Sequence, residues 1–231
     1  MINNRTLLSA AALAGIFSCA AWADDDHEGC GISAKLVASI ESTLATVVNI
    51  ADGNGGIFKP NRMWAAVVDR EGRLCHVTKI GDAWPGSRAI AIAKASTAND
   101  FSNDALSLST ANLYAPTQPG GSLYGLNNSN PFNPEFLERG AGYGSVTGGI
   151  ITFGGGVALY QGGKVIGGLG VSGDSACADH AIAYRMRALT GLDKIPSGVA
   201  PGSTDNIIYA KTGTAPTGFE HPHCFPSDIT P

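Results

Sequence analysis

The chain has 231 residues and a formal net charge of −4 at pH 7, and only 15% of its residues are charged. It contains no lysine- or arginine-rich run, so nucleic acid and anionic membranes are poor candidates as partners. Glycine is abundant, with 31 residues, and hydrophobic residues make up 44% of the chain. This composition predicts a tightly turned, partly β protein and excludes a disordered one.

Residues 1–23 have the three parts of a secretory signal peptide. Arg5 gives a positive start, residues 7–20 are apolar, and Ala21-Trp22-Ala23 is an A-x-A cleavage site. We therefore expect cleavage after Ala23, export to the periplasm or secretion, and a single mature domain at 24–231. The apolar run is short for a membrane span, and an N-terminal anchor helix is the alternative.

Four cysteines remain after that cleavage, and an even number in an exported chain predicts two disulfides. No C-x-x-C spacing exists, which argues against zinc binding or thioredoxin-like chemistry. Three pairings are open, and we expect at least one bridge to hold a terminal segment. The four are Cys30, Cys75, Cys177 and Cys224.

Apolar residues at three- and four-residue spacing predict a first helix over 32–49. Two strands, 64–68 and 74–80, follow, with a tight hairpin turn at 69–72 between them. An alanine-rich second helix is predicted over 87–101.

Residues 102–147 are rich in Asn, Pro, Gly and Ser but carry scattered aromatic residues, which favours an ordered insertion that packs on the domain. Two more strands and a third helix follow, then a Pro/Gly-rich tail at 191–231. Because hairpin-joined strands pair antiparallel, the expected fold class is α+β, one antiparallel sheet with helices on its faces. The later elements are strands at 149–160 and 164–171, a helix at 175–190 and a short tail strand at 206–209.

Three blocks of sequence carry a family resemblance over about residues 32–189. They are Ala66–Leu74, Asp82–Ser87 with Ala93–Ala98, and Phe153–Leu159 continuing through Gly163–Asp174. The chain resembles the HbpS/GlcG-like haem-binding proteins, which share a domain with the C-terminal part of PduO-type proteins. It looks like a longer exported subfamily.

The resemblance implies a profilin-like fold, assembly into homo-oligomers, and non-covalent haem as cofactor. One family member is an exported accessory to a redox-sensing kinase, which implies a membrane sensor as a further partner. No C-x-x-C-H is present, so covalent haem attachment is excluded. The chain departs from the pattern in its 102–147 insertion, its tail with Cys224, and Asp179-His180 where relatives carry Asp-Glu or Asp-Gln.

The turn between the last strand and the third helix is a candidate anion site. It contains Ser172 and Gly173, and the N–H groups and dipole at the helix start can hold a carboxylate such as a haem propionate. A capped turn without a ligand is the alternative. His180, beside Asp179, is a candidate haem iron ligand or proton carrier. The alternative is a partly exposed histidine that Asp179 hydrogen-bonds.

Three further residues are ligand candidates. His76 alternates with Cys75 along its strand, so the two should point to opposite faces. Arg88 and Lys94 should point in different directions, and either can pair with a propionate or another acid. The alternative for both is a surface or intersubunit ion pair.

Two weaker metal-binding patterns are present. Glu135 and Glu138 form an E-x-x-E pair that can bind a hard cation or ferric iron, although a solvated surface pair is the alternative. His221 and His223 flank a proline beside Cys224 and form a weak candidate metal pair.

These observations lead to three hypotheses about function. The first is an exported haem-binding protein for sequestration, transport or sensing. The second is an enzyme acting on a small organic acid or aldehyde under the long loop, with Asp179 and His180 as the acid–base pair. The third is an oligomeric module that caps a membrane partner's sensor domain. The hypotheses that involve a ligand rest on a cleft near Gly173 and His180, and without such a cleft only an exported scaffold remains.

Overall fold

The computed structural model describes residues 29–137 and 142–231, so the expected signal peptide and Glu138 lie outside the described residues. Its centre is one antiparallel sheet of four strands in the order β2-β1-β4-β3. The expected α+β fold class is thereby confirmed. The strands are β1 (Met63–Asp69), β2 (Leu74–Ile80), β3 (Gly156–Gln161) and β4 (Lys164–Ser172).

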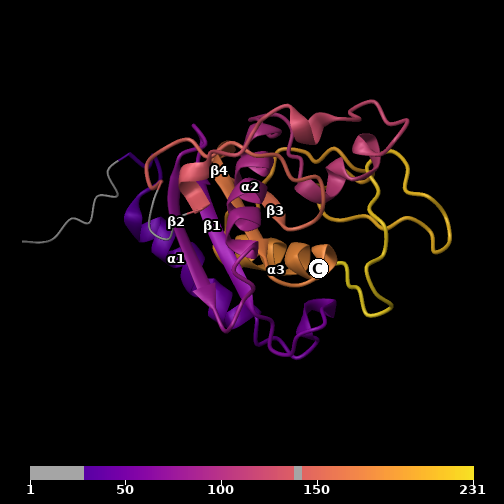
Figure 1. The fold of residues 1–231 in the computed structure, drawn as a ribbon, viewed down its shortest axis with the longest axis horizontal. Coiled ribbons are helices and arrows are strands. Elements are labelled where there is room, and N and C mark those ends of the chain that lie inside the picture. Colours follow the sequence, from indigo (N-terminus) through magenta and orange to yellow (C-terminus); the bar gives the residue numbers. More distant parts are fainter. Residues whose placement is uncertain (1–28, 138–141) are drawn as a thin grey trace, which may run out of the picture.

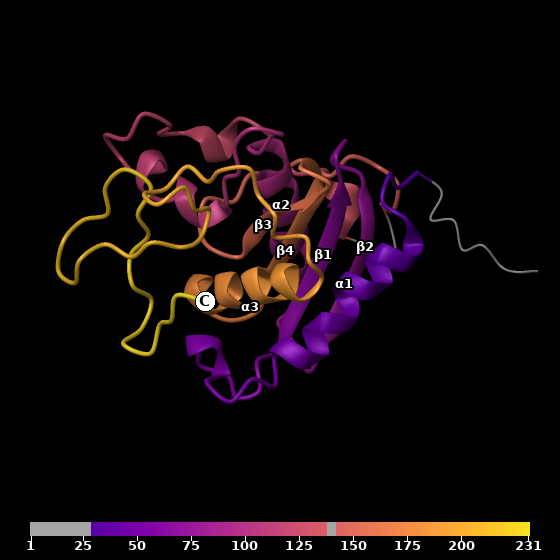
Figure 2. The same ribbon diagram turned by 180° about the vertical axis from the view of Figure 1, so that it is seen from behind.

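Helices cover both faces of this sheet (Figures 1 and 2). The helices α1 (Ala34–Val47) and α3 (Ala176–Leu189) pack on one face, and α2 (Ser87–Asp100) packs on the other. Ser33 caps α1 by accepting a hydrogen bond from the Leu36 N–H. One apolar stripe of α1 is buried against the sheet, as the spacing predicts, and it consists of Val37, Ile40, Leu44 and Val47.

Glycines on β4 allow α2 to approach the sheet at backbone distance. A Cβ at Gly168 would lie 2.1 Å from the Ala95 carbonyl oxygen, and one at Gly170 would lie 2.0 Å from that of Ala91. Since no side chain fits there, the glycine-rich third block of the sequence serves close packing of a helix on a strand. This close approach places Lys94 of α2 at the end of β4.

Three local predictions were wrong. The strand expected over 149–160 begins only at Gly156, and the expected tail strand is reduced to a single bridge between Tyr209 and His221. Cys75 and His76 do not point to opposite faces. Cys75 is the extra residue of a β-bulge, and a bulge interrupts the alternation of side chains along a strand. Both residues therefore face α1: Cys75 is bonded to Cys30 just before that helix, and His76 contacts Glu41 on it.

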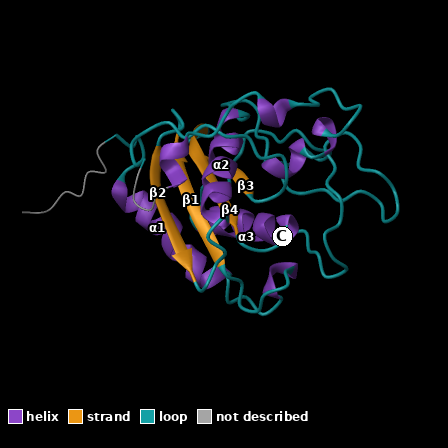
Figure 3. Cartoon of the chain, viewed as in Figure 1, coloured by secondary structure: helices purple, strands orange, loops and turns teal. Residues whose placement is uncertain are grey.

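The insertion and the tail are mostly loops and lie side by side at one end of the sandwich (Figure 3). The insertion forms short 3₁₀ turns and buries Phe136 against α2 and the sheet. Two buried side-chain hydrogen bonds help to join it to the tail, from the Ser107 hydroxyl to Asp205 and from the Asn112 amide to the Asn206 carbonyl. The tail thus completes the core around α3.

Two disulfides are present, as the cysteine count predicted, and they pair Cys30 with Cys75 and Cys177 with Cys224. Both bridges hold terminal segments, the first before α1 and the second in the tail. In the part of the chain that the structure describes, no helix has the length and apolar character needed to cross a bilayer.

Candidate functional site

The start of α3 is the centre of the candidate site, and the N–H groups of the turn before it are bonded to carboxylates of the chain itself, while the Cys177 N–H in the helix donates to the Cys224 sulfur. Ser175 is the N-cap and accepts from the Ala178 N–H. The Asp174 N–H donates to Asp179 over 2.9 Å, and the Ser175 N–H donates to Asp174 over 2.7 Å. The favourable position for an anion at this helix start is therefore filled from within the protein.

The loop before β1 closes the same turn from outside. Asp174 accepts hydrogen bonds from the backbone N–H groups of Ile57 and Phe58, and both donor–acceptor distances are 3.0 Å. A Cβ at Gly173 would lie 2.1 Å from the Arg62 carbonyl oxygen, so no space remains above the turn. Ser172 is buried as well. The capped turn, the alternative in the sequence analysis, is the arrangement observed.

Lys94 and Asp179 form a buried ion pair. The Lys94 Nζ lies 2.6 Å from Asp179 and 3.1 Å from the Val171 carbonyl oxygen, and the Phe153 ring lies 4.9 Å from the same nitrogen. Burial lowers the pKa of Lys94 and raises the pKa of Asp179 to about 6, while each charge stabilises the other. Lys94 does pair with an acid, but the partner is internal, so a surface or intersubunit pair was wrong for this residue.

His180 is fully buried, so the alternative of a partly exposed histidine was wrong. Its Nε2 accepts from the Ile207 N–H and lies 3.0 Å from the Asn206 side-chain oxygen, and both partners belong to the tail. Its Nδ1 has no hydrogen-bond partner. Burial lowers the pKa of His180 to about 3, so the ring is neutral at physiological pH.

A second buried ion pair lies about two turns further along α3 and was not predicted from the sequence. Arg187 contacts both carboxylate oxygens of Asp205, at 2.5 and 2.8 Å, and Ser107 of the insertion donates to the same carboxylate. Burial opposes both charges, but their mutual attraction prevails, because the pKa of Asp205 is lowered and that of Arg187 is raised. A single acid in a loop gives no sequence signal of this kind.

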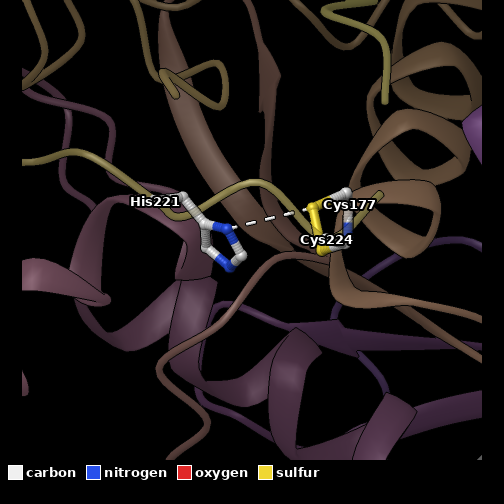
Figure 4. A group of neighbouring side chains, drawn as sticks. All are labelled: Cys177, His221 and Cys224. Carbon is white, nitrogen blue, oxygen red and sulfur yellow. Dashed lines mark hydrogen bonds between the residues drawn. A yellow bond between two sulfur atoms is a disulfide. The ribbon is translucent and has the colours of Figure 1, made fainter. Parts of the chain in front are cut away.

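The tail is fastened to the first turn of α3 beside a buried histidine (Figure 4). Cys177 is bonded to Cys224, and the His221 Nδ1 lies 4.0 Å from the Cys177 sulfur. Burial lowers the pKa of His221 to about 4. His223 stacks on Tyr209 instead, so the two tail histidines contact different partners and do not face one another.

The remaining candidates are dispersed over the molecule. His76 pairs with Glu41 and stacks on Tyr143, with ring centroids 5.7 Å apart. Arg88 donates to the Phe136 carbonyl whereas Lys94 contacts Asp179, as expected for residues pointing in different directions. Glu135 is exposed in a 3₁₀ turn, and its pairing with Glu138 stays a prediction.

The cavities of the described residues lie elsewhere. One of about 590 Å³ separates the insertion from the tail near Tyr114 and Pro216, and one of about 300 Å³ separates α2 from the insertion near Ile90 and Phe132. None of these cavities in the described part of the chain is lined by His180 or Gly173, so the cleft expected near these two residues was wrong: packed side chains and backbone fill that region. The buried polar groups around α3 hold segments of the chain together, through the Lys94–Asp179 and Arg187–Asp205 ion pairs and the hydrogen bonds of His180.

A four-stranded antiparallel sheet with helices packed on both faces defines an α+β class of protein. Within this class the chain belongs to the family described as "Haem degrading protein HbpS-like", whose model matches residues 42–188. The resemblance noted in the sequence is thereby confirmed. The tail lies beyond the matched range.

Individual relatives agree with this assignment. The chain is 34% identical over 118 residues to the corrinoid adenosyltransferase PduO of Citrobacter freundii, matching 51% of this chain but 29% of PduO. It therefore spans less than a third of that relative. An uncharacterized 15.0 kDa protein from the dhaT-dhaS intergenic region of the same organism is 34% identical over 128 residues, which is 55% of this chain and 72% of that protein.

Among solved structures, a PduOC–haem complex is 28% identical and superposes with a TM-score of 0.51. The match covers 94% of that chain and 68% of this one. Haem does not fit at His180 in this structure, because the ring is inaccessible and the tail occupies its Nε2. The role of His180 as an iron ligand thus stays a prediction that the observed conformation does not support.

Proposed function

We propose that the chain is an exported haem-binding protein that sequesters, transports or senses haem. The observation that carries the proposal is the match to nearly the whole PduOC chain, which was crystallised with haem. Membership of the HbpS-like family supports the same ligand. Assembly into homo-oligomers and contact with a membrane sensor belong to this proposal as expectations.

The enzymatic alternative receives no support from the geometry. Asp179 and His180 are neighbours in sequence but contact different partners, Lys94 and Asn206. Both are buried, so the pair cannot exchange protons with a substrate in the observed conformation.

Titration of the purified full mature chain with haemin tests the proposed ligand. We expect a saturable shift of the Soret band at micromolar haemin. The same chain in concentrated urea, where the fold is lost, serves as the control for unspecific uptake by apolar segments. An unchanged Soret band at equimolar folded protein would show that the proposal is wrong.

Export is tested separately. Two disulfides fit an oxidising compartment, which supports the proposal. Expression of the whole chain in a Gram-negative host should give a periplasmic protein. Its N-terminal sequence should begin at Asp24, and its mass should equal that of residues 24–231. Recovery of the uncleaved chain in the cytoplasm would contradict this expectation.

A further inference from the structure

An exposed group of aromatic and cationic side chains is formed by the loop before β1, the first residues of β1, the end of β2 and the segment before α2. Direct contacts join five of its members in a row. The Phe58 and Trp84 rings meet edge to face at 5.7 Å, the Trp64 indole N–H donates to the Trp84 carbonyl, and Arg62 and Lys79 lie over Phe58 and Trp64. We call this group the Trp84 patch; it consists of Ile57, Phe58, Arg62, Trp64, Lys79 and Trp84.

The Trp84 patch exposes large apolar surface. The exposed fraction is 53% for Trp84 and 55% for Ile57, although both side chains are of types that proteins usually bury. Aromatic rings and an isoleucine held together at the surface are typical of a binding site rather than of isolated exposed residues.

Hydrogen bonds hold the patch in place without any ligand. The Asp174 carboxylate fixes the backbone of Ile57 and Phe58, and the antiparallel register sets Trp64 directly opposite Lys79. The turn that the sequence analysis selected as an anion site therefore uses its carboxylate to position a neighbouring surface. A prearranged surface loses little conformational entropy when it binds.

The chemistry of the patch defines its ligand. The exposed Trp84 ring can pack on a flat apolar body, while Arg62 and Lys79, at 5.1 and 5.6 Å from the Phe58 and Trp64 ring centroids, can attract carboxylates at its edge. A second copy of the chain is less favoured, because a two-fold axis through the patch would bring these cations toward like charges. A planar macrocycle with carboxylate side chains satisfies both features.

The patch offers no customary ligand for haem iron. Of its six residues none is a histidine, cysteine, methionine or tyrosine, the side chains that hold haem iron in proteins. Binding there would depend on the porphyrin face and its carboxylates and not on the metal.

We propose that the Trp84 patch is the docking surface for a carboxylated porphyrin and that it binds the macrocycle with or without iron. The inference rests on the proposed function in taking porphyrin as the ligand. It adds the place of binding, the residues responsible and independence from the metal.

The first test compares haemin with iron-free protoporphyrin IX on the full mature chain. Their dissociation constants, measured by the Soret band and by quenching of tryptophan fluorescence, should agree within about threefold. The dimethyl ester of protoporphyrin IX should bind about tenfold more weakly, because it lacks the carboxylates that Arg62 and Lys79 attract. Tight binding of haemin alone would overturn the docking surface and leave the proposed function intact.

Variants then locate the site. Trp84→Ala should lower the affinity for both porphyrins about tenfold, as expected for loss of a central aromatic anchor. The double variant Arg62→Glu with Lys79→Glu should lower the affinity for haemin and protoporphyrin IX, which carry free carboxylates, but not the affinity for the dimethyl ester. Tyr124→Ala, which removes another exposed aromatic ring far along the chain, is the matched control and should leave affinity unchanged.

Each contrary outcome identifies what failed. Equal haemin affinity of Trp84→Ala and Tyr124→Ala would refute the patch while haem binding stood. A lower oligomer mass for Trp84→Ala, with unchanged porphyrin affinity, would assign the patch to contact between copies and also refute the docking. No binding of either porphyrin by the unaltered chain would refute the proposed function and the docking together.

Discussion

Lys94 and Asp179 come from helices on opposite faces of the sheet, and their charged atoms meet at 2.6 Å beside Gly155, just before β3 begins. The side chains are 0% and 3% exposed. The pair therefore connects the two helical layers at the point where the sheet ends. Charges removed from water in this way stabilise a fold only while both are present.

Removing either partner should destabilise the protein by about 3–5 kcal/mol, with opposite pH dependence. In Lys94→Met the pKa of Asp179 stays raised above its unfolded value, so the folded state holds an extra proton and stability falls as pH rises. In Asp179→Asn the pKa of Lys94 stays lowered, so stability falls as pH falls.

Urea unfolding at pH 5.5 and pH 8, with the unaltered chain as reference, measures this difference. Lys94→Met should lose more unfolding free energy at pH 8, and Asp179→Asn should lose more at pH 5.5. Equal losses for both variants at both pH values would mean that the pair carries no charge in the folded state.

Gly155 should be intolerant of any side chain. Its φ is +123°, and a Cβ there would lie 2.5 Å from the Val171 carbonyl oxygen and 2.6 Å from the Lys94 nitrogen. We expect Gly155→Ala to cost about 2–4 kcal/mol by thermal or urea unfolding, from backbone strain together with displacement of the ion pair. Gly120→Ala is the control, because Gly120 also has a positive φ but no atom within 4 Å of its Cβ position. A similar cost at both sites would leave only backbone strain as the cause.

Periodicity predicted the three long helices to within two residues at each end, because each has an apolar face that the sheet buries. The same reasoning failed at 149–155. The apolar composition there is typical of a strand, but Gly149 and Gly155 adopt left-handed φ values of +82° and +123°, which interrupt a ladder. Composition alone does not reveal which glycines take that conformation.

The surroundings of His180 were beyond prediction for a different reason. Its cover comes from Asn206 and Ile207, more than twenty residues away in a segment without periodic pattern. Cys75 and His76 were misplaced because one extra residue in β2 reverses the alternation of faces. Sequence reasoning located the turn at Gly173 correctly but not the internal carboxylates that fill it.

His180 should make folding sensitive to acid. Its folded-state pKa is about 3, against an ordinary value of 6.5, because burial disfavours the charged ring. The unfolded chain binds the additional proton between these values, so stability is present above about pH 6.5 and is lost as pH falls toward 3, by an amount of order 5 kcal/mol. His221, with a pKa lowered to about 4, contributes in the same direction.

The measurement is the slope of unfolding free energy against pH between 4 and 6.5. His180→Gln should flatten this slope even where it lowers stability at every pH, while His76→Gln, at a half-buried surface site, serves as the control. An unchanged slope in His180→Gln would show that the ring binds its proton equally in the folded and the unfolded chain, and would contradict the lowered pKa.

The Cys177–Cys224 bridge should hold the tail over His180. It closes a loop with a sequence separation of 47, and chain entropy then predicts a loss of about 4 kcal/mol when both cysteines become alanine. The Cys30–Cys75 bridge has a nearly equal separation of 45, so its removal should cost about the same global stability, and this variant is a matched control.

Hydrogen exchange distinguishes the two variants. Loss of Cys177–Cys224 should speed exchange of the Ile207 and Ala210 amides, which bond to His180 and His221, whereas loss of Cys30–Cys75 should leave them protected. Unchanged protection in both variants would show that non-covalent contacts alone secure the tail.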